Sequence, residues 1–75
     1  MKAELLERIS ADPEILHGNP CIKNTRIPVH LIVSLIAEGA KEEEILSDYP
    51  SLSREDISAA LHYAALCTAS ETYPL

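Results

Sequence analysis

The sequence is poor in glycine and cysteine and has no long apolar run, and each shortage excludes a class of protein. Its 75 residues include only two glycines, too few for a glycine-rich phosphate-binding loop. Cys21 and Cys67 lie far apart in a chain whose charged beginning has no signal-peptide pattern, so a disulfide scaffold is not expected. The longest apolar segment, residues 31–37, is too short to cross a bilayer. We therefore expect a cytoplasmic protein with reduced thiols and no membrane contact.

Metal-ligating and catalytic patterns are also scarce. The three histidines, His17, His30 and His62, do not form a CxxC or HxxxH spacing with each other or with the two cysteines. A Cys–His nucleophile pair has no support beyond composition. We therefore predict no catalytic residue, no metal site and no cofactor, and a protein that is not an enzyme.

Basic residues are few, and their distribution is uneven. Residues 1–31 hold four basic and four acidic side chains, whereas residues 32–75 hold two basic and eight acidic ones. The C-terminal half therefore carries the whole formal net charge of −6. This charge opposes phosphate binding there and favours a basic partner.

The N-terminal third contains turn and strand signals. Residues 4–9 fit a short helix or strand, and "ADPEI" reads as a turn because an Asp-Pro pair favours turn initiation. The β-type runs "PCI" and "TRIPV" are separated only by Lys23 and Asn24, which predicts a hairpin. Asn24 tolerates a positive φ, and Pro28 cannot donate to a sheet ladder, so its strand lies at an edge or ends there.

From Pro28 onward the apolar period changes from two to about 3.6, which predicts helices. The expected helices are "VHLIVSLIAEG" with a cap at Gly39, "KEEEILS", and "SREDISAALHYAALCTAS" with an N-cap at Ser53. "DYPSL" is a turn, and "ETYPL" is a flexible tail at about residues 70–75. The chain is predicted to be a single, mainly α domain spanning residues 1–75. Its architecture is a small three-helix helix-turn-helix of the winged or homeodomain-like kind, with a short N-terminal β-hairpin.

The helices carry more apolar surface than one small core needs. On the last helix one face, comprising Ile57, Ala60, Leu61, Ala64 and Thr68, is expected to meet the core. A second set of apolar residues lies on other sides of the first and last helices: Leu31, Leu35, Ala59, Tyr63 and Leu66. Tight packing within one chain could cover this set, but a 75-residue domain is marginal alone. We predict a homodimer with this set at the interface.

The strings "HGNPCIKNTRIPV" and "LIAEGAKEEEILSDYPSLSREDISAALHYAA" resemble the prokaryotic domain-of-unknown-function family DUF433. That family typically reads G-x-P-x-I-x-G-T-R-I-P-V, then a helix ending in Gly, an E-E-I motif, Y-P and A-L-x-Y-A. The resemblance covers about residues 8–65. It implies a helix-turn-helix protein, and often an antitoxin encoded beside a PIN-like nuclease toxin. Two positions depart from the family pattern: Asn24 replaces Gly, and Lys41 replaces the Ser or Thr that often caps the second helix.

The family-motif residues divide into two groups. Gly18, Pro20, Asn24 and Pro28 are expected to set the turn, the hairpin and the entry to the first long helix. Thr25 and Arg26 have two interpretations. In one, Thr25 hydrogen-bonds the turn and Arg26 pairs with a carboxylate of the acidic half. In the other, four cations contact phosphate or a partner: Arg8, Lys23, Arg26 and Arg54.

The functional prediction weighs two kinds of partner. A helix-turn-helix would place the last helix in the major groove, but its outward positions include only one cation, Arg54, so DNA binding by the chain alone is expected to be weak. An acidic face of Glu42, Glu43 and Glu44 suits a basic protein instead. We expect an antitoxin-like protein that neutralises a PIN-like nuclease, with some autoregulatory DNA binding. The alternative is a DNA-binding regulator without a toxin.

Overall fold

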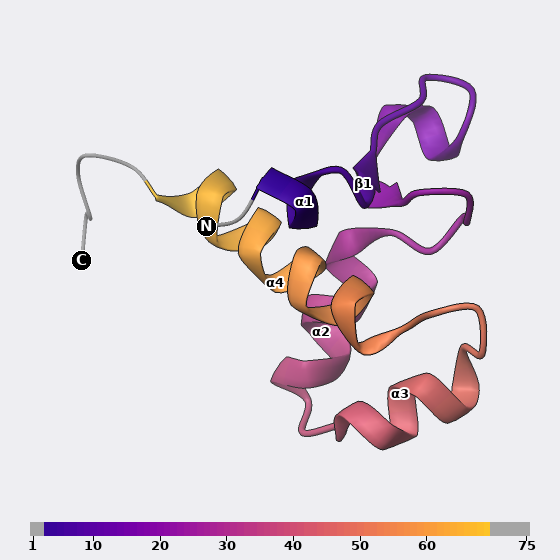
Figure 1. Ribbon diagram of the computed structural model, residues 1–75, viewed down its shortest axis with the longest axis vertical. Coiled ribbons are helices and arrows are strands. Elements are labelled where there is room, and N and C mark those ends of the chain that lie inside the picture. The colour runs from indigo at the N-terminus through magenta and orange to yellow at the C-terminus, as the bar shows by residue number, and fades with distance from the viewer. Residues whose placement is uncertain (1–2, 70–75) are drawn as a thin grey trace.

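Three main helices, a four-residue helix before them and a small two-stranded sheet make up the fold of the computed structural model, which describes residues 3–69 (Figure 1). The elements in chain order are α1 (Ala3–Leu6), β1 (Ile9–Ser10), the 3-10 turn η1 (Leu16–Gly18), β2 (Cys21–Ile22), α2 (Val29–Ala37), α3 (Glu42–Asp48) and α4 (Arg54–Thr68). α4 packs against both α2 and α1, and α3 closes the end of the molecule opposite the sheet. The predicted fold, a mainly α domain of three helices with a short N-terminal hairpin, is confirmed.

The sheet is antiparallel and joins β1 to β2. Ile9 pairs with Ile22, and Ser10 pairs with Cys21. The sequence predicted that residues 25–29 form the strand that pairs with β2, but this segment forms no named strand. Pro28 forms one isolated bridge with Cys21, and the Ile22 N–H donates to the Ile27 carbonyl at 3.0 Å. The ladder stops there because proline has no N–H to donate.

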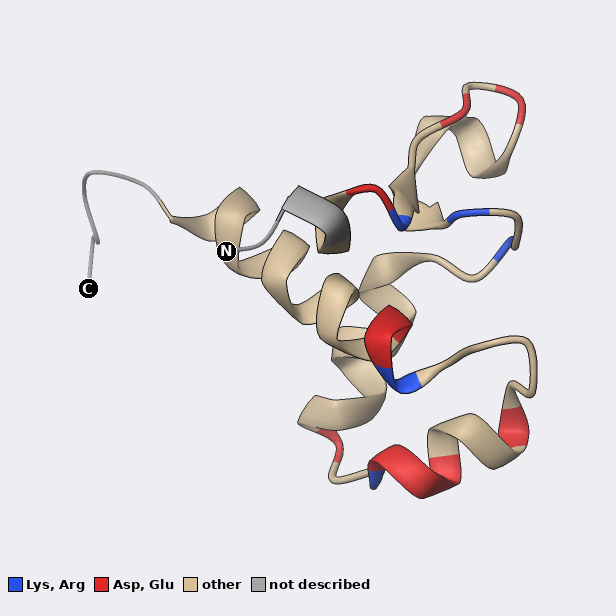
Figure 2. Ribbon diagram, in the orientation of Figure 1, with Lys and Arg blue, Asp and Glu red and all other residues tan. Residues whose placement is uncertain are grey.

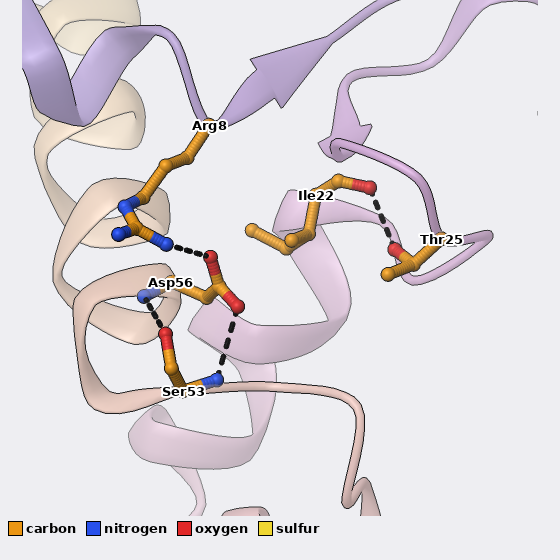
Figure 3. A network of polar contacts seen from close by, with 5 residues as sticks. All are labelled: Arg8, Ile22, Thr25, Ser53 and Asp56. Atoms are coloured by element: carbon orange, nitrogen blue, oxygen red, sulfur yellow. Dashed lines mark hydrogen bonds and ion pairs between the residues drawn. The ribbon is translucent and has the colours of Figure 1, made fainter.

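A tight turn follows β2, as the sequence predicts. Asn24 has φ 65°, in the left-handed region, and the Thr25 N–H donates to the Ile22 carbonyl at 3.0 Å. The Thr25 hydroxyl donates to the same carbonyl at 2.7 Å and accepts from the Ile27 N–H at 3.1 Å (Figure 3). Thr25 therefore ties both ends of the turn together.

The loop before β2 also has an unusual backbone. Leu16, His17 and Gly18 lie consecutively at positive φ, and the value at Gly18 is 83°. A Cβ at Gly18 would meet no atom nearer than 3.8 Å, so its backbone conformation, rather than lack of space, favours glycine there. Pro20 then accepts the Val29 N–H at 2.9 Å through its carbonyl, which fixes the start of α2 beside β2.

The core lies where α2, α3 and α4 meet β2. Its buried side chains are Ile22, Val29, Ile32, Ile45, Leu52, Ile57 and Ala60. α2 ends at the predicted glycine, since Gly39 has φ 96°. The helices α2, α3 and α4 thus contribute β-branched or small residues to one cluster.

The starts of α3 and α4 use two different caps. At α4, Ser53 Oγ accepts the Asp56 N–H at 3.2 Å and Asp56 Oδ2 accepts the Ser53 N–H at 3.0 Å, which is the predicted capping box. At α3, the Lys41 side chain has no acceptor to offer. Glu44 Oε1 instead accepts the Lys41 N–H at 2.7 Å, so half of a capping box remains.

The burial pattern corrects several predictions about α4. Ala59, predicted at an interface, is fully buried, whereas Leu61, predicted in the core, is 40% exposed. Thr68, also predicted in the core, is exposed. The physical reason is α1, which packs against α4 and shifts the buried side of that helix. The apolar pattern of α4 alone cannot show which of its sides another helix covers.

The rest of the predicted apolar interface is divided. Leu35 and Tyr63 are half-buried and pack against the core cluster, and Leu31 is also half-buried. Only Leu66, at 51% exposure, remains largely accessible. The "ETYPL" tail lies outside the described residues. None of the described helices is both long and apolar enough to cross a membrane.

Candidate partner and nucleic-acid surfaces

An open groove of about 1250 Å³ lies between α4, the segment joining α1 to β1, and the turn after β2. Its lining is Leu5, Glu7, Arg8, Lys23, Asn24, Thr25, Ser51, Arg54, Glu55, Asp56, Ser58 and His62. Three of the four cations predicted to contact nucleic acid or a partner, Arg8, Lys23 and Arg54, therefore share one surface. Arg26, the fourth, is exposed but does not line the groove.

Arg8 holds one wall of this groove to the other. Its Nη1 donates to Asp56 Oδ1 at 3.0 Å, and the carbonyl of Arg8 accepts the Lys23 N–H at 2.7 Å (Figure 3). Asp56 is 8% exposed and also caps α4, so one carboxylate serves two contacts. Because the Arg8 side chain is 43% exposed, solvent screening limits the pair to about 1 kcal/mol. One interpretation of the sequence paired Arg26 with a carboxylate of the acidic half; in the structure Arg8 makes such a pair, and Arg26 makes no ion pair within the described residues.

A second ion pair joins α4 to α3 through Arg54, which also lines the groove. Arg54 Nη1 lies 3.1 Å from Glu42 Oε1, with the arginine side chain 65% exposed. Among the groove cations of the described chain, Lys23 alone makes no ion pair. Three carboxylates, of Glu7, Glu55 and Asp56, line the same groove. The groove therefore offers ordered cations, but its charges balance.

The predicted acidic face lies on α3, and Figure 2 shows acids along this helix with one basic position at its start and another at the start of α4. Its three glutamates differ in what they do: Glu42 pairs with Arg54 and Glu44 caps the helix. Glu43 is exposed, and the aspartate at the other end of α3, Asp48, is exposed as well. Neither of these two carboxylates makes a hydrogen bond or ion pair within the described residues, so both are free to act on a partner.

The C-terminal half of α4 presents a third, apolar surface. Leu61 and Leu66 are 40% and 51% exposed, and Leu6 of α1 is 38% exposed. A hydrogen bond with the Cys67 side chain, followed by burial, raises the pKa of Tyr63 above its ordinary value, which keeps the phenol neutral.

Among residues 3–69 no group of three or more His, Cys, Asp or Glu side chains could hold a metal ion.

Residues 9–64 match the family model for a protein of unknown function, DUF433. This match spans well over half of the sequence. The chain belongs to the DUF433 family.

Two relatives extend this assignment of the DUF433 chain. It is similar to the crystal structure of a DUF433 member protein from Anabaena variabilis, with a TM-score of 0.75 and 35% identity, covering 88% of this chain and 76% of that one. It is also 38% identical over 58 residues to the uncharacterized protein y4eO of Sinorhizobium fredii. That match covers 77% of this chain but 26% of y4eO, so the chain spans about a quarter of this curated relative.

The structure explains most of the DUF433 motif as geometry. Gly18 and Asn24 occupy left-handed backbone positions, and the Pro20 carbonyl accepts the first N–H of α2. Pro28 is the N-cap residue of that helix, and the Thr25 hydroxyl closes the turn. The Arg26 side chain is exposed and makes no ion pair within the described chain. Of the motif residues, Arg26 is therefore the one that the local fold leaves available for a partner.

Sequence reasoning missed the contribution of Asp56 to the groove. The sequence predicted Asp56 as a capping acid and as part of a solvent-facing acidic cluster with Asp48 and Glu55; the second prediction is wrong, because Asp56 is 8% exposed and pairs with Arg8, 48 residues away. The spacing between them carries no periodic signal. Ser51 and Ser58 were also outside the predicted contact set, although both line the groove beside the cations.

Proposed function

We propose that this DUF433 protein is a non-enzymatic, antitoxin-like binding protein of the cytoplasm that captures a basic protein partner. The resemblance to family members encoded beside PIN-like nucleases supports such a toxin as the proposed partner. The observation that carries the proposal is the row of exposed acids on α3, Glu43, Glu44 and Asp48, beside the single exposed lysine at the N-cap of that helix, Lys41. A nuclease that acts on RNA needs a basic substrate surface, to which this face is complementary.

Charge of this kind acts mainly on the rate of association. An acidic face raises the rate at which a basic partner arrives, and salt screens the effect over about 8 Å at physiological ionic strength. Glu43 and Asp48 contribute most to this steering because both are exposed and neither carboxylate makes a hydrogen bond or ion pair within the described residues. Apolar contacts then slow dissociation.

The test measures association with the product of the adjacent reading frame at low and high salt. Replacing Glu43 by Gln and Asp48 by Asn should slow association at low salt, leave dissociation nearly unchanged and flatten the salt dependence. Glu42 and Glu44 stay intact because their carboxylates pair with Arg54 and cap α3.

The matched control for this test is Glu14→Gln. It removes one exposed carboxylate from the loop before η1, far along the chain from α3, and should leave the on-rate nearly unchanged. The proposal is contradicted if the α3 double variant associates as fast as the unmodified chain, or if the product of the adjacent reading frame does not bind at all.

A DNA-binding regulator is the second candidate, and the groove favours it. A helix-turn-helix reading of α3, the turn at residues 49–53 and α4 would present Ser58 and His62 of α4 to the major groove. Arg8, Lys23 and Arg54 would then face phosphates. With three such contacts the logarithm of affinity should fall with that of salt at a slope of about −3.

Upstream DNA of the chain's own gene is the probe for this candidate. Lys23→Ala should make the salt slope shallower by about one unit and weaken binding to all sequences alike. If the affinity for this DNA does not depend on salt, or if the DNA does not bind at low salt, the groove is not a DNA-binding surface.

A further inference from the structure

The first described segment of the chain, α1 with Arg8, covers one side of α4. α1 is a four-residue helix that packs against α4, and Arg8 Nη1 donates to Asp56 Oδ1 of α4 at 3.0 Å (Figure 3). Neither α1 nor Arg8 lies within residues 9–64, which match the family model. This cover of α4 is therefore an addition to the matched core. We refer to residues 3–8 as the strap.

Asp56, Ala59 and Tyr63 form one stripe of α4, on the side of the strap. They lie at i, i+3 and i+7, a spacing that brings side chains to the same side of a helix, and Asp56 contacts Arg8. Ala59 is fully buried yet does not belong to the core cluster, whereas its equally buried neighbour Ala60 does. The cover of Ala59 thus comes from outside that cluster, and the strap lies on this side of the helix.

The strap can leave α4 while the rest of the fold stays intact. A helix of four residues is too short to be stable alone, so α1 depends on α4 for its form. Its Leu6 side chain is 38% exposed, and the Arg8 side chain is partly open to solvent. Among the described residues, backbone hydrogen bonds to the sheet begin at Arg8, whose carbonyl accepts the Lys23 N–H at 2.7 Å. Release of residues 3–7 therefore breaks neither the sheet nor the core.

Charge decides what can replace the strap on this stripe. Asp56 is 8% exposed, and a buried charge without a partner is costly. An acidic or wholly apolar segment would leave this carboxylate unpaired. A segment that places an apolar side chain on the stripe and a cation at Asp56 would restore both contacts. The strap itself has this pattern, because Leu5 is half-buried and Arg8 follows three residues later.

We propose that the stripe of Asp56, Ala59 and Tyr63 is a docking site for an apolar segment followed by a cation, and that the strap occupies this site until a partner displaces it. The displacing segment belongs to the basic protein partner, an identification that rests on the proposed function. Exposed acids on α3 attract that partner, and the stripe then holds it through the buried carboxylate. The strap lowers the affinity because it competes for the same surface.

Thiol modification measures how readily the strap opens. In a Cys67→Ser background, Ala59→Cys places a thiol beneath the strap, and Ala60→Cys places one at an equally buried position in the core. Cys21, which is buried, stays as an internal reference for global unfolding. A thiol reagent should modify the Ala59→Cys position at least about tenfold faster than the Ala60→Cys position, because local opening is easier than global unfolding. Equal rates overturn the proposal.

Arg8→Gln, with Arg26→Gln as its matched control, tests the ion pair that holds the strap. Both variants remove one exposed arginine, but Arg26 makes no ion pair within the described residues. Arg8→Gln should speed modification at Ala59→Cys about fivefold and leave Ala60→Cys nearly unchanged. Arg26→Gln should change neither rate. If Arg8→Gln has no effect at Ala59→Cys, the strap is not held by this pair and the proposal is overturned.

Hydrogen exchange of the unmodified chain gives a second measurement that needs no cysteine variant. The Arg8 N–H donates to the Leu5 carbonyl at 3.1 Å, a bond that is lost when α1 leaves α4. This amide should exchange faster than the hydrogen-bonded amides of α4, and faster still at high salt, which screens the pair of Arg8 with Asp56. An Arg8 amide that exchanges as slowly as those of α4 overturns the proposal.

A peptide that copies residues 1–10 supplies the docking segment as a separate molecule. A tethered segment acts at an effective concentration of about millimolar, so the peptide at several millimolar competes with it. On the chain that carries Arg8→Gln and Ala59→Cys, this peptide should slow thiol modification at least about twofold. The same peptide with its arginine replaced by glutamine should not. No protection by the first peptide, or equal protection by both, overturns the docking site.

Binding to the product of the adjacent reading frame separates this inference from the proposed function. Arg8→Gln should lower the dissociation constant about fivefold because the strap competes less, whereas Arg26→Gln should not lower it. If the adjacent product does not bind at all, the proposed function fails, and the peptide still decides whether the docking site exists. If the product binds and Arg8→Gln does not tighten the complex, the partner does not use the stripe and the inference is overturned.

Discussion

Asn24 shows how one backbone angle selects a residue. At φ 65° a side chain without branching at Cβ is tolerated, and Asn is among the best non-glycine choices. This position explains why the family pattern has glycine where this chain has asparagine. The departure keeps the turn instead of altering it.

The first prediction concerns this turn. Asn24→Gly should be neutral or slightly stabilising, since glycine fits the angle but loses more entropy on folding. Asn24→Val should lower the free energy of unfolding by more than about 1 kcal/mol, because a β-branched residue is strained at positive φ. Thermal melts of the two variants measure this difference. Equal melting temperatures would contradict the assigned turn geometry.

The second prediction concerns the hydroxyl of Thr25. Thr25→Val keeps the shape but removes a 2.7 Å bond to the Ile22 carbonyl and a 3.1 Å bond from the Ile27 N–H. Losing both should cost about 1–3 kcal/mol. Thr25→Ser keeps the hydroxyl and serves as the control, with a smaller loss in chemical denaturation. If the two variants unfold alike, the hydroxyl does not hold the turn.

At the scale of elements, Asp56 connects the first turn of α4 to the segment after α1. The same carboxylate accepts the Ser53 N–H and the Arg8 guanidinium. A short segment with few contacts of its own is thereby fixed to the longest helix of the described chain. The groove keeps its shape through this connection.

A double-mutant cycle over Arg8→Met and Asp56→Asn measures the connection. Asp56→Asn should cost more than Arg8→Met, because the aspartate also caps α4 and is buried. The coupling energy should be about 1 kcal/mol and should shrink in high salt. A coupling near zero at low salt would show that Arg8 is not fixed to α4 in solution.

For the molecule as a whole, the core is small, so any stability gained from association with another chain is important. A 75-residue domain buries a modest share of its surface, and the buried cluster here holds seven residues. Stability added by a dimer depends on concentration, because only the folded pair is favoured by mass action. The homodimer that the sequence predicts would therefore make the stability of the fold depend on concentration.

This prediction implies a melting temperature that rises with protein concentration. Where the dimer dominates, the melting temperature should rise by about 3–5 °C for each tenfold increase in protein concentration. Scanning calorimetry over two decades of concentration measures this rise, and a constant melting temperature would contradict the predicted dimer.

The sequence by itself determined the features that depend on near neighbours in the chain. The three long helices, the Gly39 cap, the Ser53 capping box and the left-handed Asn24 all follow from local propensity and hydrogen bonding within a few residues. The family motif is local for the same reason. Each of its residues except Arg26 acts on its own turn or helix start.

Only the tertiary structure decided which faces are covered. The periodicity of α4 placed Leu61 inside and Ala59 outside, and α1 reversed this by packing against the helix from 50 or more residues earlier in the chain. The tertiary structure also paired Asp56 with Arg8, and it brought Arg8, Lys23 and Arg54 to one groove. Contacts between distant segments depend on how whole helices and strands pack together, and the local sequence pattern of one helix does not determine that packing.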